Sequence, residues 1–135
     1  MSEFVVFDTS VLIDYQRSGR HSQRLDTHPG IIRNSSVVLA ELWRGATEVA
    51  ERKFLSALEE SRPVLTPTEK NWLESGKILS KMQRDKGFEP HKLRDLHVDV
   101  LIALTARSYG AKLITSNRVD FELIREYRDF EMEVW

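Results

Sequence analysis

The sequence contains no cysteine, so it can form no disulfide framework, no zinc–thiolate site and no catalytic thiol. It also lacks any run close to the ~20 apolar residues that a membrane-spanning helix needs. The apolar run near the N-terminus, residues 4–7, is too short for a signal peptide and is interrupted by Asp8. These absences lead us to expect a cytoplasmic protein.

The sequence also has no large excess of positive or negative charge. The chain has 20 Lys and Arg residues against 21 Asp and Glu residues, which gives a net charge of -1. This balance argues against a protein that binds nucleic acid through bulk charge, although it leaves room for local basic patches. With 135 residues, 41% of them hydrophobic and 30% charged, the chain is expected to form one soluble domain, residues 1–135, with a substantial core.

The stretch EFVVFDTSVLIDY, residues 3–15, organises the rest of the chain. Its apolar run at 4–7 is rich in β-branched and aromatic residues, which is typical of a strand covered on both faces. Thr9 and Ser10 are predicted to cap the helix that follows. Asp8 then lies at the carboxyl end of a central strand, where open α/β sheets bind ligands. The alternative is that Asp8 only caps the helix.

Hydrophobic periodicity and turn residues predict the remaining elements. Strands are predicted at 31–33, 63–65, 112–115 and 131–135, helices with their cap residues at 34–45, 48–60, 66–86, 95–109 and 121–127, and loops at 87–93 and 116–120. Strands that alternate with helices indicate an α/β fold, with a mainly parallel sheet covered by helices on both faces.

Three acids stand where a carboxylate is costly: Asp8 after the apolar strand, Glu41 in VVLAELW and Asp99 in LHVDVLIALTA. A fourth acid, Asp120, follows the predicted strand KLIT. Because strand ends and adjoining helix starts of one parallel sheet converge on the same crevice, we expect the four acids to meet there. Each also has a simpler explanation, since Glu41 can pair with Arg44, Asp99 with a nearby basic residue, and Asp120 can cap a helix.

A cluster of carboxylates requires a compensating charge. Two carboxylates ~4 Å apart repel each other by about 4 kcal/mol at an effective dielectric of ~20. All candidate ligands are oxygens, and no His pair has i, i+4 spacing, so Mg²⁺ or Mn²⁺ is favoured over zinc. Ions held by few carboxylates typically act on phosphate groups by activating a water and neutralising developing charge.

The ordered motifs FVVFDTSVLIDY, SSVVLAELWRGA and DVLIALTARSYGAKLITSNRVDF are similar to those of PIN-domain proteins, specifically the VapC-type toxin ribonucleases of type II toxin–antitoxin modules. They cover nearly the whole chain in the family's order and spacing. The resemblance implies a three-layer α/β sandwich with a central parallel sheet and Mg²⁺-dependent endoribonuclease activity. It also implies a homodimer, and a small VapB-like antitoxin that fills the groove beside the active site, in some cases within a larger toxin–antitoxin complex.

The resemblance also assigns residues. It implies that Asp8, Glu41, Asp99 and Asp120 are the four family acids, with Asp8 and Asp99 as the principal metal ligands. Glu41 and Asp120 would complete the ligand shell or orient the attacking water. The polar positions that support the acids are those of Thr9, Thr115 and Asn117. Val98 departs from the family pattern, in which Asn often precedes the third acid.

The RNA substrate is expected to be positioned by phosphate contacts from Lys and Arg. The candidates flank the site on two sides, namely Arg17, Arg20, Arg24 and Arg44 on one and Lys86, Lys92 and Arg94 on the other. An ordinary solvated surface is the alternative for each. Trp43, Trp72 and Phe54 are candidates for an antitoxin groove or a dimer face, with core packing as the alternative.

Two other classes of phosphate-handling protein are disfavoured. A response-regulator receiver needs an adjacent acid pair, but Phe7 precedes Asp8. A haloacid-dehalogenase-type phosphatase needs a second acid two residues after the first, where Ser10 stands. A PIN-like module that binds RNA or protein without catalysis is the remaining alternative.

Overall fold

The computed structural model describes residues 3–135. Its five strands form one sheet in the order β3-β2-β1-β4-β5, and every neighbouring pair is parallel. The strands are β1 (Phe4–Phe7), β2 (Ile31–Ser35), β3 (Val64–Leu65), β4 (Lys112–Thr115) and β5 (Met132–Val134). The predicted α/β class with a parallel sheet is confirmed, and β1 lies at the centre, where its apolar run predicted it.

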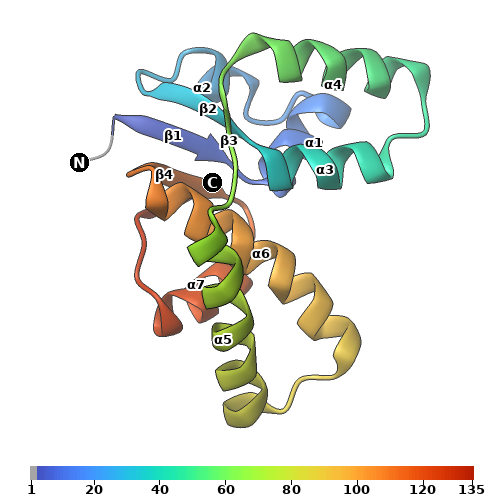
Figure 1. Ribbon diagram of the computed structural model, residues 1–135. Coiled ribbons are helices and arrows are strands. Elements are labelled where there is room, and N and C mark those ends of the chain that lie inside the picture. Colours follow the sequence, from blue (N-terminus) through green and yellow to red (C-terminus); the bar gives the residue numbers. More distant parts are fainter. Residues whose placement is uncertain (1–2) are drawn as a thin grey trace.

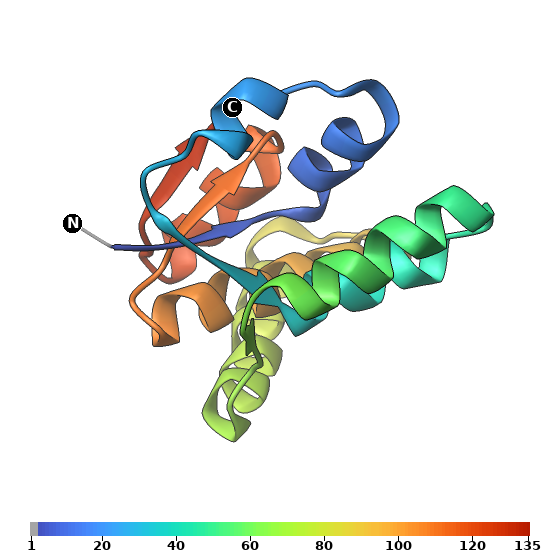
Figure 2. The ribbon, with the colours of Figure 1, turned by 90° about the horizontal axis from the view of Figure 1, so that it is seen from above.

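Helices cover both faces of the sheet. They are α1 (Thr9–Ser18), α2 (Ser22–Asp26), α3 (Ser36–Gly45), α4 (Val49–Ser61), α5 (Glu69–Lys86), α6 (Pro90–Ser108) and α7 (Arg118–Tyr127). Figure 1 shows α1 to α4 on one side of the sheet and α5 to α7 on the other, which gives a three-layer sandwich. Figure 2 shows the C-terminal end beside α2, where the Trp135 ring packs 4.2 Å from the Arg24 guanidinium carbon.

The core lies between the sheet and the helices on both of its faces, and α6 contributes the longest buried run. Val5 and Val6 of β1 and Leu113 and Ile114 of β4 are at most 1% exposed. In α6, a continuous run from Val100 to Ala106 is buried, which explains why this helix has almost no polar face. No helix within residues 3–135 combines the length and the apolar composition needed to cross a membrane.

Two pairs of helices extend from the carboxyl edge of the sheet. Figure 1 shows the α3–α4 pair and the α5–α6 pair diverging on the side to which the β1 arrow points. Cap residues fix where α3 and α5 begin, because Ser35 accepts a hydrogen bond from the Val38 amide and Thr68 accepts one from the Asn71 amide. The base of the opening between the pairs is therefore where the strand ends deliver their side chains.

Three predicted boundaries are wrong. The loop predicted at 87–93 is shorter, because α6 begins at Pro90, whose fixed φ suits the first helical position. The loop predicted at 116–120 is also shorter, since Asn117 caps α7 and Asp120 lies in the first turn. Thr9 and Ser10 do not cap α1, because Thr9 is already helical and Asp8 holds the N-cap backbone conformation.

Candidate active site

Asp8 is a buried carboxylate at the end of the central strand. Its side chain accepts hydrogen bonds from Ser10 Oγ and Thr115 Oγ1, both at 2.8 Å. Burial raises the pKa of Asp8, and the two hydroxyls partly oppose that shift because they favour the charged form. Asp8 makes no side-chain capping bond to α1, so the helix-cap explanation accounts for its backbone position but not for its carboxylate contacts.

Glu41 faces the same edge of the sheet from α3. Thr9 Oγ1 donates a hydrogen bond of 2.6 Å to Glu41 Oε1, and Arg44 Nη2 lies 4.0 Å from Glu41 Oε2. The predicted contact with Arg44 is present, but it is long and Arg44 is largely exposed, so it compensates little of the charge. Burial is the main reason why the pKa of Glu41 is raised, and the nearby Asp8 carboxylate adds to the shift.

Asp99 is the least compensated acid of the group. Among residues 3–135 it forms no hydrogen bond or salt bridge, whereas the other three acids each have a side-chain donor. Its pKa is raised to about 8, first by burial and then by the charges of Asp8, Glu41 and Asp120. The expected pairing with a neighbouring basic residue is absent within the described chain, and Arg94 instead lies 3.2 Å from His91 Nδ1.

Asp120 approaches from the first turn of α7 and is neutralised by a lysine. Lys92 Nζ lies 2.8 Å from Asp120 Oδ1, and Asn117 Nδ2 donates to Asp120 Oδ2 at 3.1 Å. Asn117 also accepts a hydrogen bond from the Asp120 amide, so Asn117 rather than Asp120 caps the helix. The four acids come from the end of β1 and from α3, α6 and α7. The charges of Asp8, Glu41 and Asp120 raise the pKa of Asp99.

The donor set fits a hard divalent cation in its chemistry, since every candidate ligand is a carboxylate oxygen and Asp99 lacks a partner. Within residues 3–135, however, no group of three His, Cys, Asp or Glu side chains is arranged so that it could hold a metal ion as it stands. The acids are gathered in one region, but they do not form a finished coordination sphere.

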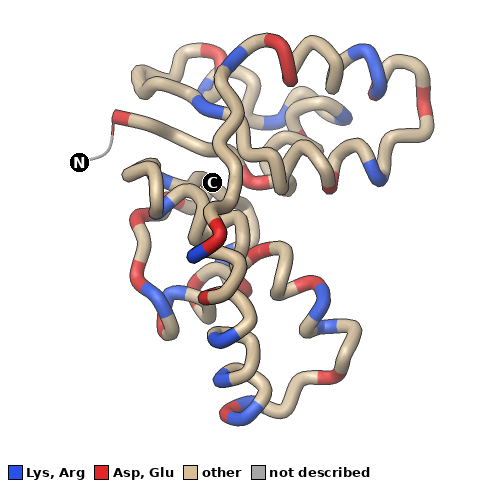
Figure 3. The backbone as a smooth tube through the Cα atoms, in the orientation of Figure 1, with Lys and Arg blue, Asp and Glu red and all other residues tan. Residues whose placement is uncertain are grey.

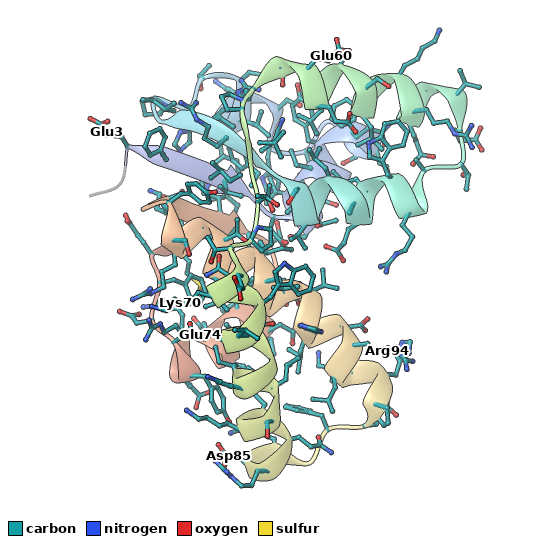
Figure 4. All side chains as sticks on the ribbon, in the orientation of Figure 1. Glu3, Glu60, Lys70, Glu74, Asp85 and Arg94 are labelled. Carbon is teal, nitrogen blue, oxygen red and sulfur yellow. The ribbon has the colours of Figure 1, made fainter. Side chains whose placement is uncertain are left out.

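The predicted RNA-positioning residues are dispersed. Arg17 lines a small cavity that Glu41 also lines. Arg20 pairs with Asp14 at 3.9 Å, and Arg24 packs on Trp135. Figure 4 shows Arg94 on α6 pointing outward from the molecule. In the view of Figure 3, Lys and Arg positions are interspersed with Asp and Glu positions along both helix pairs.

An open groove of about 420 Å³ adjoins the acids between α3, α5 and α6. Its lining includes Glu41, Val37 and Val98. Trp72 also lines the groove, and this residue is 53% exposed. Trp72 is therefore not a core residue. Phe54, by contrast, is half-buried against Tyr15, with ring centroids 6.1 Å apart.

Sequence reasoning missed two contacts of the site. Ser10 was expected to cap a helix, but its hydroxyl donates to Asp8. Lys92 was expected to meet RNA from a loop, but it lies on α6 and contacts Asp120. The signal for the second contact was present in the sequence, since Pro90 can open a helix that places Lys92 two turns before Asp99.

The PIN domain model matches residues 5–126 of the chain. The chain belongs to the PIN domain family. This PIN domain is similar to a chain of the DNA-bound VapBC of Salmonella typhimurium, with 25% sequence identity, a TM-score of 0.71 and coverage of 100% of this chain and 99% of that one. The family resemblance noted from the sequence is thus confirmed.

Two further solved structures share the fold of this PIN domain. A chain of VapBC2 from Rickettsia felis, bound to a promoter DNA fragment, is 22% identical with a TM-score of 0.70 and covers 98% of both chains. VapC20 of Mycobacterium tuberculosis, described as a sarcin-ricin loop cleaving toxin, is 18% identical with a TM-score of 0.66, and the match covers 88% of this chain and 94% of that one. No curated protein is significantly similar in sequence.

Proposed function

We propose that this PIN domain is a metal-dependent endoribonuclease and the toxin of a type II toxin–antitoxin module. The observation that carries the proposal is the convergence of Asp8, Glu41, Asp99 and Asp120, which leaves Asp99 without a partner and with a pKa near 8. Buried carboxylates whose charges raise one another's pKa values are an arrangement that favours a cation site. The family match and the VapC neighbours support the nuclease class.

Asp8, Glu41 and Asp99 are the residues that would hold Mg²⁺ or Mn²⁺. When bound, such an ion supplies positive charge to the phosphate and lowers the pKa of a water. The hydroxyls of Ser10 and Thr115 fix the Asp8 carboxylate, so this acid stays in place without the ion.

Glu41 is suited to handle a proton. It is half-buried, it is oriented by Thr9, and its pKa is raised above the usual range, so it can accept a proton from a water that attacks the phosphodiester in line. The products would be a free 3′-hydroxyl and a 5′-phosphate. Arg44 and Arg17, which lie near Glu41, would contact the RNA backbone.

Cleavage of a structured RNA by the purified protein tests the proposal. Asp8→Asn and Asp99→Asn should each lower the Mg²⁺-dependent cleavage rate by about a thousandfold or more, since each removes a carboxylate that would hold the ion. Asp129→Asn is the matched control, because the Asp129 side chain is 89% exposed and lies outside the acid group. Full Mg²⁺-dependent activity of either site variant, with native circular dichroism, would refute the assignment.

A PIN module that binds RNA or protein without catalysis is the alternative, favoured by the lack of a finished coordination sphere within residues 3–135. Titration calorimetry with Mn²⁺ separates the two. The nuclease should show heat that Asp99→Asn removes, whereas the binding module should show no carboxylate-dependent heat.

The proposal implies a VapB-like antitoxin and a homodimer as partners. The 420 Å³ groove with the exposed Trp72 beside it provides apolar surface close to the acids. Light scattering of the protein alone, and after co-expression with the product of any short reading frame directly upstream of its gene, measures both associations. A monodisperse monomer in both samples would contradict them.

A further inference from the structure

One cation already lies within the acid group. The ammonium of Lys92 is 2.8 Å from Asp120 Oδ1, and the two side chains are 37% and 17% exposed. The contact ties the start of α6 to the start of α7, so it spans two elements that both border the site. It is much closer than the contact of 4.0 Å between Arg44 and Glu41.

Lys92 also acts on a second acid of the group, Asp99. Lys92 and Asp99 are two turns apart on α6 and therefore lie on one face of the helix. Of the causes that act on the pKa of Asp99, Lys92 is the positive charge that opposes burial and the three carboxylates. Lys92 thus acts on two of the four acids, one by contact and one through space.

Asp120 has both carboxylate oxygens engaged. Oδ1 accepts from Lys92 and Oδ2 accepts from the Asn117 amide group. A metal ion bound directly to Asp120 would compete with the Lys92 ammonium for the same negative charge. The remaining acids, Asp8, Glu41 and Asp99, have hydroxyl donors or no donor at all within residues 3–135, so a cation displaces no ammonium from them.

We propose that the Lys92 ammonium takes the place of a second metal ion in this site. It neutralises Asp120, so that Asp8, Glu41 and Asp99 bind a single divalent ion. The inference rests on the proposed function, because it divides the four acids of that site between one bound ion and one side chain. Two-metal sites keep their ions about 4 Å apart, and an ammonium is a compact charge that can fill one of the two positions.

Metal binding without substrate tests the division. In calorimetry with Mn²⁺, the unmodified protein should bind one ion. Lys92→Met keeps the chain length and removes the charge, so it should bind the first ion at least about tenfold more tightly and admit a second ion at Asp120. Lys92→Arg should behave like the unmodified protein, and Lys92→Met combined with Asp120→Asn should return to one ion.

Lys112→Met is the matched control. Lys112 Nζ forms an equally short contact of 2.9 Å with Glu133, between β4 and β5, away from the four acids. Its loss should leave the Mn²⁺ isotherm unchanged. Thermal unfolding of each variant shows whether it is folded, and Asp120→Asn alone, which should still bind one ion, keeps the test decisive if Lys92→Met is not.

The outcomes separate the inference from the proposed function. Two ions in the unmodified protein, of which Asp120→Asn removes one, would overturn the role of Lys92 while leaving the nuclease intact. If the unmodified protein binds one ion and Lys92→Met leaves the isotherm unchanged, the role of Lys92 is likewise overturned and the nuclease assignment is left intact. No heat at all in the unmodified protein would refute the cation site, and the inference with it.

Discussion

Replacing Asp99 by Asn should stabilise the metal-free protein. The carboxyl has a pKa of about 8 in the folded chain against an ordinary value of 3.8, because burial and three neighbouring carboxylates disfavour its charge. Folding at pH 7 therefore requires the ionised side chain of the unfolded state to take up a proton. At about 1.4 kcal/mol per pKa unit this costs about 4 kcal/mol at most. Local relaxation lowers that penalty, so we expect Asp99→Asn to raise the free energy of unfolding by about 1–3 kcal/mol.

The sign of the pH dependence follows from the raised pKa. The penalty is absent below the unfolded pKa, near pH 4, grows as the pH rises and levels off above pH 8. The stabilisation by Asp99→Asn should therefore be small near pH 4.5 and largest near pH 8. Mg²⁺ should reverse it, since the ion stabilises only the chain that keeps the carboxylate.

Urea unfolding in EDTA, followed by the fluorescence of the three tryptophans, measures the effect at several pH values. Asp129→Asn should give no such pH-dependent gain, because that side chain is 89% exposed. An Asp99→Asn protein that is equally stable or less stable than the unmodified protein at pH 8, in the absence of metal, would show that the four acids do not repel one another as described.

Three further substitutions test the hydrogen bond to Asp8 and the packing beside the central strand. Thr115→Val removes a hydroxyl that donates to the buried Asp8 at 2.8 Å, so it should lower the free energy of unfolding by about 1–3 kcal/mol at pH 7 in urea titrations; an unchanged midpoint would count against this hydrogen bond. Gly30→Ala should cost about 1–3 kcal/mol, because a Cβ there would lie 2.7 Å from Val5 Cγ2 on the central strand. Gly76→Ala, with no atom within 4 Å of the added Cβ in the middle of α5, should instead stabilise by about 0.5–1 kcal/mol, and equal effects of the two would contradict the packing around β1.

The layout of the fold could be predicted because its signals are local. The apolar run Phe4–Phe7 required a strand covered on both faces, and the structure places it between β2 and β4. The start of α6 was missed because Gly87 and Pro90 in one short stretch indicate a loop, although Pro is also a good first residue of a helix.

The composition of the site was predictable, but its internal contacts were not. Three acids in otherwise apolar settings could be recognised from their cost and Asp120 from its place after a strand, and strand-end geometry predicted that they meet. Which hydroxyl donates a hydrogen bond to which carboxylate depends on how the strands pair. The Thr115 hydroxyl reaches Asp8 only because β4 lies beside β1. The pairing of Lys92 with Asp120 depends on how α6 and α7 pack, and no sequence spacing encodes that.

The central position of β1 has a consequence for the order in which the protein becomes active during synthesis. β1 leaves the ribosome before its partner β4, and the Thr115 hydroxyl that holds Asp8 comes more than a hundred residues after that acid. A chain synthesised only as far as Asp8 therefore lacks β4 and the three helices, α3, α6 and α7, that supply the other acids. A chain that has not yet been translated as far as Asp120 cannot bring the four acids together, so on the proposed function it would not cleave RNA.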